Sequence, residues 1–204
     1  DMKNSKMNAI YLGDARLGLG RDYYQKVNEK NTEALAEYTK YVASMLQVLG
    51  YKNADATAKK IVDFEKSIAQ TLYTNEQSRD SNLFYNPKTA AELKELSKNV
   101  DLAGYLAKLG VSYDKVIVGE INYYKNLDKF INPANISLIK DYMKFHLLSG
   151  SASYLSKDLD AKRFDFYGKY LRGQQEQRAQ NKRAFELING SLGEAFGKLY
   201  VEKY

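Results

Sequence analysis

Cysteine and tryptophan are absent from this chain of 204 residues, and histidine occurs once, at position 146. Without cysteine there is no disulfide framework, no thiolate metal site and no nucleophilic thiol. A single histidine cannot supply the two imidazoles, one helical turn apart, that an H-E-x-x-H zinc site requires. His146 stands between Phe145 and Leu147, a setting more typical of a packed core histidine than of a ligand. We therefore expect no catalytic residue, no metal ligand and no cofactor in this chain, while its substrate-binding residues stay unknown.

Long apolar runs and blocks of one charge are also missing. No stretch of 18 apolar residues exists, which excludes a membrane-spanning helix in the visible chain. The net charge of +6 comes from 31 basic and 25 acidic residues that are interspersed, and the densest basic stretch is 178–183. A nucleic-acid interface would need stronger clustering. We expect no nucleic-acid partner, and a basic nucleic-acid-associated protein is the weakest of the functional interpretations.

Several short motifs have structural explanations. No phosphate-cradling G-x-x-x-x-G-K-[ST] occurs, and the close glycines of 17–20 lack a following dinucleotide unit, so that segment is predicted to be a turn. Asp158 and Asp160 lie at an expected helix start, where the helix dipole favours carboxylates. For Arg21 and Asp22, a buried or half-buried ion pair that fixes the preceding loop is favoured over a direct functional role.

The chain is rich in helical periodicity. Apolar residues at spacings of three and four predict helices over 35–49, 61–72, 136–147 and 185–200. Asn31 or Thr32 is expected to cap the first of these, and Gly50 to end it. Thr89 and Glu92 form a capping box that opens a short helix, and Asn132 with Pro133 opens the helix over 136–147. The run 116–118 is β-branched and too short for a helix nucleus, so it predicts a lone strand or an extended pass.

These patterns predict an all-α fold. We expect an irregular domain of about seven or eight helices over 1–204, with at most one or two very short strands. The helix over 136–147 is apolar around most of its circumference and should be central. If the final helix packs Phe185, Ile188, Leu192, Phe196 and Leu199 into the core, it is structural rather than a loose linker, and its three glycines should mark where another helix or a missing catalytic half comes close. It stops on an aromatic residue without a polar tail, which suggests a domain of a longer protein.

Five blocks carry a family resemblance over essentially the whole chain. Together they resemble the N-terminal region of the neprilysin and endothelin-converting-enzyme family of zinc endopeptidases, and the bacterial PepO-type oligopeptidases in particular. The blocks are Asp1-Met2-Lys3-Asn4-Ser5, residues 17–24 (LGLGRDYY), residues 64–69 (FEKSIA), Arg79-Asp80 followed by residues 85–89 (YNPKT), and residues 189–204 (NGSLGEAFGKLYVEKY).

The resemblance implies a non-catalytic helical cap. In such enzymes this region faces the catalytic domain across a closed cavity and admits only small peptides. It implies zinc in the full-length enzyme, none in this segment, and two partners: the C-terminal catalytic domain of the same chain and small peptide substrates. A bacterial periplasmic or secreted location is favoured, and a cytoplasmic one stays open. The alternative is a stand-alone helical protein-binding module, which a reading frame without a downstream H-E-x-x-H would favour.

Overall fold

The computed structural model describes residues 1–204, and 65% of them are helical. Ordinary globular proteins have about a third of their residues in helices. The predicted all-α class is therefore confirmed. The chain divides into two compact units, 1–162 and 163–204, which are described separately below.

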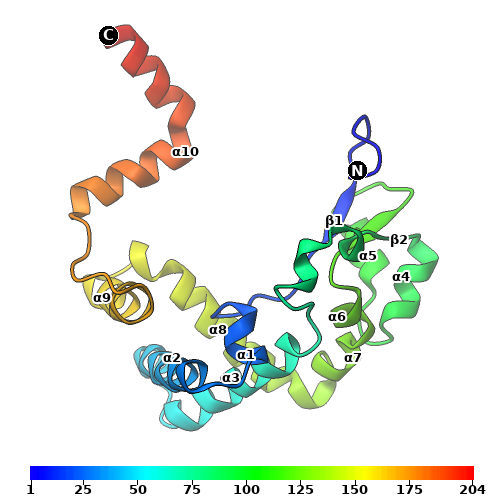
Figure 1. The fold of residues 1–204 in the computed structure, drawn as a ribbon, viewed down its shortest axis with the longest axis horizontal. Helices are drawn as coiled ribbons and strands as arrows, with labels where there is room; N and C mark the ends of the chain where they lie inside the picture. Colours follow the sequence, from blue (N-terminus) through cyan, green and yellow to red (C-terminus); the bar gives the residue numbers. More distant parts are fainter. The chain divides into compact units, whose positions relative to one another are not determined.

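Four helices form the first part of the larger unit (Figure 1). The helices α2 and α3 pack side by side, and α1 and α8 contact both of them. Their shared core contains the fully buried Tyr38, Leu46, Ile61 and Phe145. The bounds of these elements are α1 Arg21–Gln25, α2 Glu29–Val48, α3 Ala54–Ala69 and α8 Ile136–Ser151.

The start of α2 differs from the sequence expectation. Asn28 is the cap, and its side chain accepts a hydrogen bond from the Asn31 backbone N–H at 2.8 Å. The Asn31 side chain instead donates to the backbone carbonyls of Asp22 and Lys26. The helix thus begins a turn earlier than predicted, because Asn31 is used to hold the end of α1. Gly50, at φ +82°, follows the helix end as expected.

A small sheet with short helices forms the second part of this unit. The strand order is β1-β3-β2, with β1 parallel and β2 antiparallel to β3. This is one strand more than expected, and the additional strand, β2, contains Pro87 at an edge, where its missing N–H is tolerated. The elements are β1 Ile10–Leu12, β2 Asn86–Lys88, β3 Val116–Val118, α4 Ala90–Leu96, α5 Leu102–Lys108, α6 Ile121–Lys125 and α7 Leu127–Phe130.

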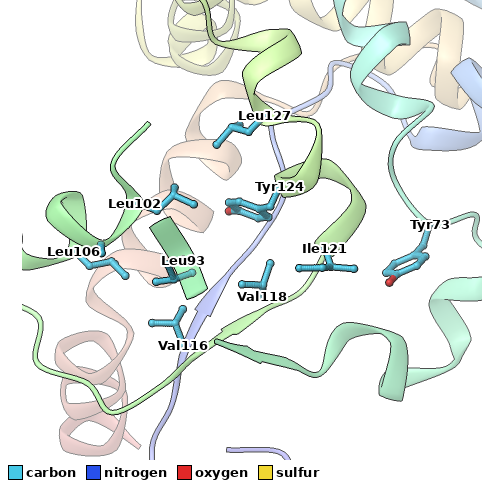
Figure 2. Packing of buried hydrophobic residues seen from close by; sticks show 10 residues of the cluster. Tyr73, Leu93, Leu102, Leu106, Val116, Val118, Ile121, Tyr124 and Leu127 are labelled. Carbon is cyan, nitrogen blue, oxygen red and sulfur yellow. The ribbon is translucent and has the colours of Figure 1, made fainter. Parts of the chain in front are cut away.

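The sheet and its helices enclose a second apolar cluster (Figure 2). Val116 and Val118 of β3 lie in it, fully buried. Leu93 of α4 and Tyr124 of α6 pack against them. The predicted capping box opens α4, since Thr89 and Glu92 exchange both hydrogen bonds. The β-branched run is therefore a strand, as one of the two alternatives predicted, but it is the buried middle strand of three and not a lone strand.

Short helical turns complete the larger unit. The polar connection 74–87 contains two 3₁₀ turns, Gln77–Arg79 and Ser81–Phe84. Asn132 caps the 3₁₀ turn Pro133–Asn135, which runs directly into α8. A further turn, Ala152–Tyr154, leads to α9, Lys157–Phe164, where the boundary with the second unit falls. Ten α-helices are found where seven or eight were expected. The difference reflects short helices, since α1, α6 and α7 have only four or five residues each.

The second unit consists of the end of α9, a π-helical segment at Asp165–Tyr170, and α10, Gln180–Lys203. The helix α10 is interrupted at Leu192, whose φ of −129° and ψ of 33° are not helical. Across this kink the rings of Phe185 and Phe196 meet edge to face, with centroids 5.3 Å apart. The interruption lies between Gly190 and Gly193, where glycine weakens the helix.

Within the second unit, α10 does not bury its apolar residues, and Phe185, Ile188 and Leu192 are exposed there. No other atom of this unit lies within 4 Å of a Cβ built on Gly190, Gly193 or Gly197. The packing of α10 on a core outside this unit stays a prediction. Amphipathic periodicity shows that a helix has an apolar face, but it does not say whether the same chain supplies the cover.

Candidate functional site

The environment of the single histidine is a buried hydrogen-bond network. His146 on α8 lies with its Nε2 2.7 Å from the Oε1 atom of Glu65 on α3. Glu65 has no solvent exposure, and its carboxylate also accepts hydrogen bonds from the Tyr38 hydroxyl at 3.1 Å and the Tyr24 hydroxyl at 2.6 Å. One carboxylate therefore links α1, α2, α3 and α8. The packing role predicted for His146 is supported by these contacts.

The glycine-rich turn before α1 closes over the same carboxylate. The Gly18 N–H donates to Glu65 Oε2 at 3.4 Å, and the Leu19 N–H donates to the Tyr24 hydroxyl at 3.1 Å. A Cβ on Gly18 would overlap the Tyr38 hydroxyl, so this position has no room for a side chain. The segment is thus shaped by close packing on the network rather than by a bound phosphate.

Arg21 and Glu120 form a second polar cluster that joins the two parts of the larger unit. An Arg21 guanidinium nitrogen lies 2.8 Å from Glu120 Oε1 and donates to the Tyr73 carbonyl at 2.6 Å. The Tyr73 N–H donates to the other Glu120 oxygen at 2.9 Å. Arg21 also reaches Asp14 at 3.5 Å, so it fixes the preceding loop as expected. Asp22 does not take part, because adjacent helical residues point in different directions, and it pairs with Lys26 instead.

Sequence reasoning missed Glu65 and Glu120. The signal for Glu65 was its spacing of four from Ile61 and three from Ile68, which places a carboxylate inside an apolar stripe. Glu120 comes directly after the buried strand β3. Both are buried charges with several hydrogen-bond partners, the arrangement that makes such burial tolerable.

Neither cluster supplies a metal site. The 204 described residues contain no group of three or more His, Cys, Asp or Glu side chains that could hold a metal ion. The imidazole Nε2 of His146 is engaged by Glu65, and no second imidazole exists. Asp158 and Asp160 lie in the first turn of α9, as predicted, and Asp158 is 3.8 Å from Lys162. A zinc ion therefore does not fit the donor set of this chain.

Two surface grooves are present in the larger unit. One, of about 610 Å³, is lined mainly by neutral amides and hydroxyls, among them Gln25, Gln70 and Asn122. The other, of about 540 Å³, lies beside β2 and contains the Lys88–Glu92 ion pair at 3.3 Å. Amide and hydroxyl groups donate and accept hydrogen bonds, but they do not provide a metal ligand set or an activated nucleophile. None of the helices combines the length and the hydrophobicity that crossing a lipid bilayer requires.

Comparison with known proteins places this arrangement in context. The model of peptidase family M13, built for its N-terminal region, matches residues 1–204. The neutral endopeptidase of Lactobacillus helveticus is 30% identical over 207 residues, covering 100% of this chain and 32% of that protein. Endothelin-converting enzyme 1 of Mus musculus is 30% identical over 166 residues, covering 77% of this chain and 22% of that protein.

Solved structures show the same fold. The zinc metalloprotease Zmp1 of Mycobacterium tuberculosis in its open state superimposes with a TM-score of 0.84 at 27% identity, covering 95% of this chain and 31% of that one. PepO from Lactobacillus rhamnosis has a TM-score of 0.78 at 22% identity, over 90% of this chain and 30% of that one. The chain thus spans between about a fifth and a third of the length of these relatives.

Proposed function

Because this chain belongs to peptidase family M13, we propose that it is the helical cap of a larger zinc-dependent metalloendopeptidase. In this proposal the cap restricts the access of peptides to a catalytic cavity and contributes no catalytic group. Zinc, its ligands and the peptide-cleaving machinery belong to the C-terminal part of the same polypeptide. Small peptides are the substrates, and a bacterial periplasmic or secreted location is favoured.

One observation carries the proposal: a match to the N-terminal family model covers all 204 residues, yet these residues include no metal-binding cluster. The relatives are about three times as long as this chain, which leaves room for a separate catalytic part. A catalytic zinc needs three protein ligands and an open position. Since this chain offers one histidine, already bound to Glu65, those ligands have to come from elsewhere.

The buried hydrogen-bond networks of the larger unit support a sieving role. A wall that selects by size has to keep its shape when large molecules press against it. Here the buried carboxylates of Glu65 and Glu120 each tie together segments that are distant in the sequence. Buried, fully hydrogen-bonded networks of this kind specify one arrangement of the helices.

The proposal is tested on the full-length protein that contains this chain. Hydrolysis per cleavable bond is measured for a series of peptides of increasing length and for a large unfolded protein. A sieve predicts efficient cleavage of short peptides and a steep loss beyond a limiting length. Equal rates for short peptides and for the large unfolded protein would show that the chain does not select by size.

A second candidate is a stand-alone protein-binding module. It is favoured by the exposed apolar side chains on α8 and α10, such as Leu147 and Leu199. The reading frame after Tyr204 separates the two: an H-E-x-x-H with a distal glutamate supports the cap, and an early stop codon supports the module.

A further inference from the structure

The helix α8 has two faces of unlike surroundings. On the inner face, Phe145, His146 and Ser149 are buried, and the Ser149 hydroxyl lies 2.8 Å from the Tyr41 hydroxyl. On the opposite face, Ile136, Met143 and Leu147 follow one another at spacings of seven and four, which aligns them along the helix. Their exposed fractions are 45%, 61% and 73%.

The exposed stripe continues past the end of α8. Tyr154 ends the 3₁₀ turn that follows α8, and Leu155 comes directly after it; both are exposed. We name Ile136, Met143, Leu147, Tyr154 and Leu155 the outer α8 face. Exposed large apolar side chains aligned on one face are candidates for an interaction surface. The sequence predicted that α8 would be central, and packing within residues 1–162 covers its inner face.

We propose that the outer α8 face is the surface on which the polypeptide following Tyr204 docks. This rests on the proposed function, in which this chain is the N-terminal part of a longer enzyme. The length of the relatives supports this occupant, since this chain spans 32% of the Lactobacillus helveticus protein and matches the N-terminal region of the family. A covalently attached domain reaches the surface at high effective concentration, so it competes well against other partners.

The charge around the stripe defines the chemistry of the partner. Lys140 lies on the line of the stripe and is exposed, and Lys144 is exposed beside it. Lys144 contacts Tyr51, with its Nζ 3.3 Å from the hydroxyl. The docking segment should therefore present an apolar groove for Met143 and Leu147 with carboxylates at its rim. The inner face cannot serve this purpose because it is already filled by α2 and α3.

Thiol labelling of the full-length protein tests the proposal, since residues 1–204 contain no cysteine. Leu147→Cys is compared with Leu109→Cys, a matched leucine at the end of α5. Leu147 is the more exposed of the two, at 73% against 57%, so without docking its variant reacts with a maleimide at least as fast. Docking predicts that Leu147→Cys reacts at least about tenfold more slowly, because a covered thiol reacts only when the interface opens. Mass spectrometry of the labelled peptides separates these thiols from any others.

The outcomes are distinct. Equal labelling rates of the two variants overturn the docking surface. Protection of the Leu147→Cys thiol that disappears on dilution also overturns it, because it indicates that a second copy of the chain covers the face. Met143→Cys replaces Leu147→Cys if the latter does not fold. Zinc content and peptide hydrolysis are measured on the same unmodified protein. Slow labelling in a protein without zinc or activity supports the docking surface and rejects the proposed function. Fast labelling in a protein with zinc and activity rejects the docking surface and supports the proposed function.

Discussion

Glu65 is a carboxylate without solvent exposure whose charge is stabilised by neighbouring donors. Tyr24, Tyr38 and His146 approach it from three different helices. Burial of an unpartnered carboxylate is strongly unfavourable, whereas a fully hydrogen-bonded one is tolerated. The packing of α1, α2, α3 and α8 therefore includes a shared set of hydrogen bonds to Glu65.

His146→Ala should destabilise the larger unit. The substitution removes a partner of Glu65 and leaves a void beside Phe145, and loss of one partner of a buried polar group costs about 1–3 kcal/mol before the void is counted. The free energy of unfolding is measured by urea titration. His146→Gln, which keeps an amide donor, should recover part of the loss. An unchanged midpoint for His146→Ala would show that the network does not support the fold.

The Lys26–Glu76 pair should give a defined pH dependence. The hydrogen bond from the Lys26 ammonium, at 2.8 Å, lowers the pKa of Glu76 to about 2. A carboxylate with a lowered pKa stabilises the fold above its unfolded pKa of about 4.3, and this contribution is lost as the pH falls towards 2. The stability difference between the natural chain and Glu76→Gln should therefore shrink over that range. Lys26→Met should reduce the same pH dependence, because Lys26 is the largest cause of the lowered pKa of Glu76. Salt should weaken it too, because both side chains are exposed.

At the scale of elements, α8 and α10 differ in what their apolar residues contact. The inner face of α8 packs on α2 and α3, whereas α10 has no buried residue in this chain. Glycines at 190 and 193 flank the kink at Leu192, and a contact between Phe185 and Phe196 bridges it. The stability of the chain should accordingly depend on α8 and hardly on α10.

Leu192→Ala should change the melting temperature of this chain very little. Leu192 is 60% exposed, so its truncation neither opens a cavity nor removes much buried area. Leu46→Ala in α2 is the matched comparison, because Leu46 has no exposure and its truncation should cost about 2–5 kcal/mol. Thermal unfolding followed by circular dichroism measures both. A loss for Leu192→Ala as large as that for Leu46→Ala would mean that α10 packs within the chain after all.

At the scale of the whole molecule, the chain should bind no stoichiometric zinc and hydrolyse no peptide by itself. Its one histidine is held by Glu65, and carboxylates without imidazole or thiolate make a poor zinc site. Metal analysis after dialysis should find well under one zinc per chain. Tight zinc binding with peptide hydrolysis that survives His146→Ala would reject the assignment of this chain to the non-catalytic part.

The sequence by itself determined the helical class, the capping box at Thr89, the strand at 116–118 and the family. These follow from local rules, since periodicity, caps and β-branched runs act over a few residues. The predicted cap of α2 was one turn too late. The Asn31 side chain donates a hydrogen bond to the Asp22 carbonyl of α1, and no local sequence rule predicts this contact. Periodicity also predicted the apolar face of α10, but it does not identify the element that covers this face.

Only the tertiary structure decided which charged residues are buried and which segments they join. Arg21 and Glu120 are 99 residues apart in sequence and 2.8 Å apart in space, and Glu65 meets His146 across 81 residues. Such pairs form because folding brings their elements together and removes water from both groups. Each group then needs a hydrogen bond or ion pair from the other to replace its lost contacts with water. The two faces of α8 also differ only in the tertiary structure. Both carry apolar residues in the sequence, and packing against α2 and α3 covers one of them.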